Sequence, residues 1–153
     1  MIVRDENQAL SVAVEMEKRA IRMYERALML ATDDEVRRGI SSILEDERRH
    51  LCRFTAMQGG KETSATEDAI LTDAMASQVL FTGGMAEMNR AHAMTTLRGL
   101  YEYAAESEQD AVEKYTSFAE ASDREDVKAA FLAIAEEEKT HLQDLRQSLK
   151  AMP

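Results

Sequence analysis

A Glu-x-x-His motif occurs twice in this chain and limits the folds that it can adopt. Glu47 and His50 form one copy, and Glu138 and His141 form the other, 91 residues later. Both copies lie in stretches without glycine or proline that are rich in residues favouring helix. Residues at positions i and i+3 share one face of an α-helix, so each Glu and His are predicted to point toward one location.

The repeat extends beyond these two motifs. With the same offset of 91 residues, Glu17 corresponds to Glu108, and Tyr24 corresponds to Tyr115. Apolar neighbours also correspond, including the pairs Ala20 and Ala111, Val36 and Val127, Ile43 and Ile134, and Leu51 and Leu142. A duplicated helical hairpin is the simplest explanation, because this period is too long for a solenoid repeat.

Four long helices are predicted from hydrophobic periodicity and capping signals. They run over 6–31, about 33–57, 95 or 96 to about 121, and about 123–149. Capping-box patterns at 32–35 and 122–125 are predicted to start the second and fourth helices. Hairpins 6–57 and 95–150 are joined by a connection over 58–94, in which the apolar run 69–81 predicts one short helix. The whole chain, 1–153, is predicted to be a single all-α domain.

The spacing within each hairpin aligns acidic side chains. Glu17 and Glu47 are equidistant from Thr32 in the first predicted turn. An equal rise of about 1.5 Å per residue in both helices therefore brings the two carboxylates to one height. Glu108 and Glu138 flank the second predicted turn in the same way. Each hairpin thus offers two glutamates and one histidine at one level.

Two such hairpins packed with pseudo-two-fold symmetry would bring four carboxylates and two imidazoles together. Four buried carboxylates cannot all stay ionised without cations, because an unpaired buried charge is very costly and like charges raise one another's pKa. Four negative charges match two divalent metals, and carboxylate with imidazole favours iron or manganese over structural zinc. The predicted metal ligands are Glu17, Glu47, His50, Glu108, Glu138 and His141.

Other polar side chains have plainer interpretations. A single Glu-x-x-His on a helix is usually a solvent-exposed face, and only its duplication with a second upstream glutamate favours a metal. Asp46 and Glu137 precede each histidine by four residues and are interpreted as surface charges or as partners of the ligands. Cys52 is interpreted as a small buried residue turned away from the site. His92 has no repeat partner and is predicted to be exposed.

The two repeated tyrosines have two interpretations. Tyr24 and Tyr115 lie seven residues after Glu17 and Glu108, two turns along the same helix face. They could be core aromatics with a hydrogen-bonded hydroxyl. We favour donors to a ligating carboxylate, behind the ligands themselves.

Composition excludes several functional classes. The formal net charge of −10 argues against nucleic-acid partners and anionic membrane surfaces, both of which need clustered Lys and Arg. The one cysteine rules out an intramolecular disulfide and a Cys-x-x-Cys site within the chain. The first residues show no apolar signal region, and no segment is long and apolar enough to span a bilayer, so a cytoplasmic protein is expected.

The chain resembles the rubrerythrin branch of the ferritin-like superfamily. The resemblance rests on Glu17-x-x-Ala20-x-x-x-Tyr24 with Glu47-x-x-His50, and on Glu108-x-x-Ala111-x-x-x-Tyr115 with Glu138-x-x-His141. It covers roughly residues 6–56 and 96–149. It implies a ferritin-like four-helix bundle, built from two repeated hairpins with a long crossover connection, around a di-iron centre. Glu47 and Glu138 would bridge the irons, Glu17 and Glu108 would be terminal ligands, and each iron would take one histidine.

The chain departs from rubrerythrins proper at two points. It has no Cys-x-x-Cys to build a rubredoxin-like iron site. Ala111 stands where rubrerythrins carry an extra glutamate, three residues after the third-helix ligand. The chain is therefore similar to minimal, more symmetric rubrerythrin-like proteins.

The resemblance implies a non-haem di-iron oxidoreductase that reduces hydrogen peroxide or dioxygen with electrons from a separate donor such as rubredoxin. The cofactor would be two iron ions, with manganese or zinc as other occupants. A ferroxidase or iron-storage protein is the alternative, and storage would require a large hollow assembly or an encapsulating partner. A metal-free interaction bundle is a third hypothesis, and hydroxylation of an organic substrate stays open. The resemblance also implies a homodimer, with hairpins exchanged between chains as a variant.

Overall fold

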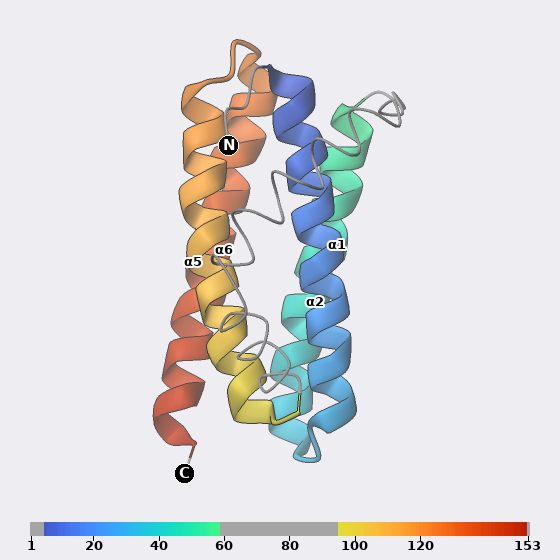
Figure 1. Cartoon of the computed structure of the whole chain (residues 1–153), viewed down its shortest axis with the longest axis vertical. Coiled ribbons are helices and arrows are strands. Elements are labelled where there is room, and N and C mark those ends of the chain that lie inside the picture. The colour runs from blue at the N-terminus through green and yellow to red at the C-terminus, as the bar shows by residue number, and fades with distance from the viewer. Residues whose placement is uncertain (1–4, 59–94, 153) are drawn as a thin grey trace, which may run out of the picture.

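Four long helices form the described part of the molecule. The computed structural model describes residues 5–58 and 95–152, which contain α-helices and no β-strand. Helix α1 spans Glu6–Leu30, α2 spans Asp34–Met57, α5 spans Leu97–Glu120 and α6 spans Glu125–Ala151. None of these helices is long and apolar enough to cross a membrane. They pack as the ferritin-like four-helix bundle that the sequence predicts (Figure 1).

The bundle consists of two antiparallel hairpins, α1 with α2 and α5 with α6 (Figure 1). The hairpins meet where α1 packs against α5 and α2 packs against α6. Helix α2 ends and α5 begins at opposite ends of the bundle (Figure 1). The predicted connection between them, with its short helix at 69–81, lies outside the described residues.

Side-chain caps start three of the four helices. Asp5, Asp33 and Thr96 each accept a hydrogen bond from the backbone N–H three residues later, at 2.9–3.0 Å. The first predicted capping box was placed one residue too early, because the N-cap of α2 is Asp33 and not Thr32. Both residue types are good N-caps, so local sequence does not separate them.

Helix α6 is capped from another hairpin. It begins at Glu125, two residues later than predicted, and its N-cap residue Arg124 gives no side-chain cap. Oε1 of Glu6 in α1 instead accepts hydrogen bonds from the backbone N–H groups of Asp123 and Arg124, both at 2.6 Å, and from the Ser122 hydroxyl at 2.8 Å. The backbone hydrogen bond from Arg124 lowers the pKa of Glu6. This carboxylate satisfies free backbone donors and complements the positive end of the helix dipole.

The core has two apolar layers, separated by the level of the six predicted ligands. On every helix the predicted ligands fall between residues of one layer and residues of the other. The aromatic layer contains Phe54, Tyr115, Phe118 and Phe131, whose ring centroids lie 5.2–6.4 Å apart. The aliphatic layer includes Ile40, Leu44, Leu100 and Leu145. Each such side chain contributes about 1.5–3 kcal/mol when buried, so the layers stabilise a fold whose middle is polar.

Candidate metal centre

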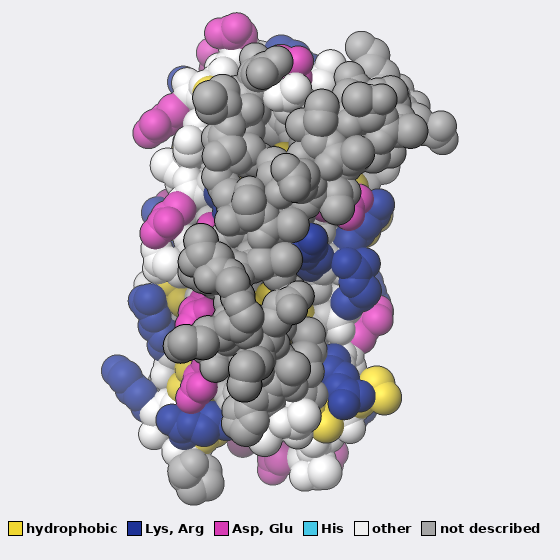
Figure 2. Space-filling model, viewed as in Figure 1, with side chains coloured by type: hydrophobic (Ala, Val, Ile, Leu, Met, Phe, Trp, Pro, Cys, Tyr) yellow, Lys and Arg dark blue, Asp and Glu magenta, His cyan; other side chains and the backbone are white. Residues whose placement is uncertain are grey.

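The structure brings all six predicted ligands together at the middle of the bundle. Each is 1–4% exposed, and the set is Glu17 of α1, Glu47 and His50 of α2, Glu108 of α5, and Glu138 and His141 of α6. Neither described histidine is visible on the face in Figure 2. The six side chains form two overlapping groups of four, and within each group one ligand atom per residue lies within 4.8 Å of the others. The helical spacing is the reason, because these positions lie on the inner faces of neighbouring helices at one height.

The first donor group contains Glu17, Glu47, His50 and Glu138. Nδ1 of His50 lies 3.0 Å from Glu47 Oε2, 3.1 Å from Glu138 Oε1 and 3.8 Å from Glu17 Oε2. Three helices therefore supply this group.

The second donor group contains Glu47, Glu108, Glu138 and His141. Nδ1 of His141 lies 2.9 Å from Glu138 Oε2, and 3.7 Å from both Glu47 Oε1 and Glu108 Oε1. Glu47 and Glu138 belong to both groups, and each turns one oxygen toward each histidine. We call them the shared carboxylates.

The outer nitrogens of both histidines contact carboxylates on the opposite helix. Nε2 of His50 lies 2.6 Å from Glu137 Oε2, and Nε2 of His141 lies 2.9 Å from Asp46 Oδ2. An N–H held there leaves Nδ1 free to face the centre, which is how proteins orient ligating histidines. The sequence interpretation of Asp46 and Glu137 left their role open, although they are themselves related by the offset of 91 residues.

Arg49 connects the two outer carboxylates. Its guanidinium donates to Asp46 Oδ1 at 2.7 Å and to Glu137 Oε1 at 3.1 Å. The equivalent position in the second hairpin is Thr140, so one arginine serves both histidine–carboxylate pairs. Sequence reasoning missed Arg49, because it has no repeated counterpart.

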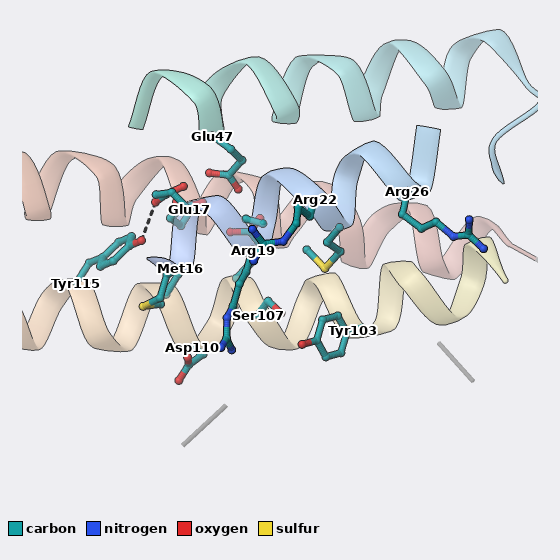
Figure 3. A pocket seen from close by; sticks show the side chains of 15 residues that line it. Met16, Glu17, Arg19, Arg22, Arg26, Glu47, Tyr103, Ser107, Asp110 and Tyr115 are labelled. Carbon is teal, nitrogen blue, oxygen red and sulfur yellow. Dashed lines mark hydrogen bonds between the residues drawn. The ribbon is translucent and has the colours of Figure 1, made fainter. Parts of the chain in front are cut away.

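The two tyrosines also pair across the hairpins. The hydroxyl of Tyr115 in α5 donates to Glu17 Oε1 in α1 at 2.6 Å (Figure 3), and the hydroxyl of Tyr24 in α1 donates to Glu108 Oε1 in α5. Burial raises the pKa of both phenols well above the usual value, and the facing carboxylates raise it further. The tyrosines therefore stay protonated and act as hydrogen-bond donors, as expected from the sequence.

Burial also changes the ionisation of the carboxyl groups. It raises the pKa of Glu17 and Glu108 well above the ordinary value, and the charge of a shared carboxylate adds to the rise. Burial acts in the same direction on Glu138, but hydrogen bonds from His141 and His50 outweigh it and lower the pKa of Glu138.

The pKa values of the two histidines are raised, although burial by itself would lower them. Desolvation alone would lower their pKa, but hydrogen bonds with Glu138 and other carboxylates of the cluster raise the pKa of His141 to about 11 and also raise that of His50. Without a metal, protons on the histidines and on two glutamates balance the buried charge. A bound cation must displace those protons.

The donor set fits a metal. Among the described residues, Oε2 of Glu17 is a buried side-chain atom that lacks a hydrogen-bond partner, and it lies in the first donor group. An unpaired buried carboxylate oxygen is costly, and a cation beside it would remove that cost. The donors are carboxylate oxygens and imidazole nitrogens without a thiolate, which suit iron and manganese.

The remaining sequence interpretations have mixed outcomes. Cys52 is exposed, so the interpretation as a buried residue is wrong. Two positions beyond His50 is about 200° around the helix, which places Cys52 on the outer face. Glu45 and Glu136, the residues that precede Asp46 and Glu137, are exposed. His92 lies outside the described residues.

A pocket of about 450 Å³ reaches the cluster between α1 and α5 (Figure 3). Four of the six predicted ligands line it, namely Glu17, Glu47, Glu108 and Glu138. The two histidines, held by Asp46 and Glu137, do not. Among the described residues, this pocket therefore reaches the cluster on its glutamate side.

One comparison with known protein families agrees with this geometry. The rubrerythrin family model matches residues 99–153, which include Glu108, Glu138 and His141. No curated protein and no solved structure matches the chain. The described helices and the buried cluster define a ferritin-like bundle with a candidate metal site. Within that class, residues 99–153 of the chain are similar to the rubrerythrin family.

Proposed function

We propose that this chain is a non-haem di-iron oxidoreductase that reduces hydrogen peroxide or dioxygen with electrons from a separate donor protein. The observation that carries the proposal is the pair of donor groups that have Glu47 and Glu138 in common. Shared carboxylates hold two cations close together, and four carboxylates match the charge of two divalent ions. In this proposal Glu17 with His50, and Glu108 with His141, complete the two coordination sets.

The protein's own residues prepare the centre. Bound iron would supply electrons and Lewis acidity for reducing an O–O bond. Asp46 and Glu137 hold the imidazoles in orientation, while Tyr24 and Tyr115 hold one oxygen of each terminal glutamate. The aromatic and aliphatic layers keep water from the centre along the bundle axis, where a low local dielectric strengthens these interactions.

The test is anaerobic loading with ferrous iron, followed by stopped-flow oxidation with peroxide and with oxygen. We expect faster oxidation by peroxide. The variant Glu47→Gln should lose tight iron binding in both groups, whereas Glu45→Gln, on the exposed face of the same helix, should behave as the unsubstituted protein. Oxidation no faster than that of free ferrous iron would refute the proposal.

Iron storage is the competing function, and iron uptake separates the two. An oxidoreductase of this kind should stop at about two irons per chain. Uptake well above this ratio, in a large particle by sedimentation, would replace our proposal with storage. On the resemblance alone we also propose a homodimer, with or without exchanged hairpins, and a rubredoxin-type electron donor.

A further inference from the structure

The pocket above the cluster is larger than peroxide or dioxygen requires. Its volume of about 450 Å³ falls in the usual range of about 300–1,000 Å³ for sites that hold organic ligands. Ala20 and Ala111, which are equivalent in the repeat, both line it. A methyl side chain at each position leaves the space that a longer side chain would fill. The opening is therefore built into both hairpins.

Arginine side chains line the outer part of this pocket. Arg19, Arg22 and Arg26 follow one another at helical spacing on α1. Figure 2 shows basic side chains exposed on the α1 side of this face. Arg19 reaches from α1 across the pocket toward Ser107 and Asp110 of α5 (Figure 3).

The charges of Arg19 and Arg22 at the rim are not paired within the described part of the chain. Among the described residues, Arg19 and Arg22 form no ion pair within 4.0 Å, whereas many exposed arginines of this protein do. Asp110 is the acidic residue of the rim, and Lys114 already pairs with it. The remaining acidic residues of the lining are the four glutamates of the cluster, whose charge two divalent cations would cancel. A loaded centre therefore lies beneath a cationic rim in a chain whose net charge is −10.

Part of the pocket lining is apolar. Met16 and Met23 of α1 and the ring of Tyr103 of α5 contribute to it. A cationic rim over a thioether and aromatic wall matches a small molecule with an anionic head and a short apolar body.

We infer that this pocket binds a small organic carboxylate next to the metal centre, with Arg19 and Arg22 holding the carboxylate group. The inference rests on the proposed centre, because the pocket is lined by the four glutamates that would hold the metals. The opposite side of the cluster offers no comparable entrance among the described residues, since Asp46, Glu137 and Arg49 close it around the histidines. An organic anion so placed would be a co-substrate or a regulator of the same centre.

The test uses the full chain loaded with zinc, which carries no redox chemistry. Zinc stoichiometry is measured first, and absence of zinc binding would count against the metal centre itself. Hexanoate and its neutral isostere hexanamide are then titrated by calorimetry, with inorganic phosphate as a third probe. We expect hexanoate to bind at least about tenfold more tightly than hexanamide, as a charge-assisted contact predicts.

Variants locate the site. Arg19→Gln with Arg22→Gln should remove the preference for hexanoate, and Ala20→Leu should block both organic probes without changing charge. Arg53→Gln, an exposed arginine of α2 outside the pocket, should bind as the unsubstituted protein does. Equal binding of hexanoate and hexanamide, phosphate binding as tight as hexanoate, or an equal loss in Arg53→Gln would overturn the inference while leaving the metal centre standing.

Discussion

The histidine–carboxylate pairs cross between α2 and α6, and this crossing allows the two donor groups to be perturbed separately. Asp46 of α2 accepts from His141 of α6, and Glu137 of α6 accepts from His50 of α2. Asp46→Asn should therefore weaken metal binding at the second donor group, whose histidine lies on the other helix. Glu137→Gln should weaken the first donor group.

The expected magnitude follows from the contacts. Removing the partner of a ligating histidine typically costs about 10–100-fold in metal affinity. Asp46 and Glu137 are 36% and 38% exposed, and the amide replacements can still accept a hydrogen bond, so we expect the lower end of that range. A tenfold loss is about 1.4 kcal/mol. Arg49→Gln should cost less, about two- to fivefold, because its ion pairs are exposed, but it should affect both groups.

The assay combines zinc calorimetry with NMR of histidine labelled with nitrogen-15. Calorimetry gives the two affinities, and the ring nitrogen signals report which histidine is occupied at less than full loading. Glu45→Gln is the matched control, since it removes one exposed carboxylate next to Asp46 that does not contact a histidine. The reasoning fails if Asp46→Asn weakens binding at His50, or if neither variant differs from the control.

Three further perturbations test the fold and the cluster. Tyr115→Phe removes the hydroxyl that donates a hydrogen bond to buried Glu17. Urea unfolding of the metal-free protein should show that the free energy of unfolding falls by about 1–3 kcal/mol, and an unchanged value would contradict the pairing. Phe54→Ala in the aromatic layer should lower the free energy of unfolding by about 3–5 kcal/mol. Leu132 is 44% exposed, so Leu132→Ala should lower it by at most about 0.5 kcal/mol. Folding raises the pKa of His141 to about 11 and also raises the pKa of Glu17. In the unfolded chain, the histidine releases its proton near pH 6.5 and the glutamate near pH 4.3, whereas the folded protein retains both protons to higher pH. The stability that protonated His141 contributes is present below about pH 6.5 and is lost as the pH rises toward 11, and the stability that Glu17 contributes is also lost with rising pH. The Tm measured in the presence of a chelator should therefore fall from pH 6 to pH 9. A Tm that rises over this range would contradict the reasoning.

Much of the fold was predictable because its signals are local. Helical periodicity and capping signals predicted four helices whose ends are off by two residues or fewer. The errors arose where local signals compete or are absent. Thr32 and Asp33 are both good caps, and the start of α6 depends on Glu6, which is more than 100 residues away in the chain. Cys52 was misassigned because its residue type was weighed above its angular position on the helix.

The convergence of the six side chains follows from the amino-acid sequence, because the duplication and the helical repeat fix both their face and their height. Their individual contacts depend on the packing of the helices. Tyr24 with Glu108, Tyr115 with Glu17, and each histidine with its outer carboxylate are pairs separated by 84–98 residues. Spacing within one helix cannot specify such pairs, since they depend on how one hairpin packs against the other. The same packing creates the arginine-lined pocket between α1 and α5, whose lining includes Ala20 and Ala111.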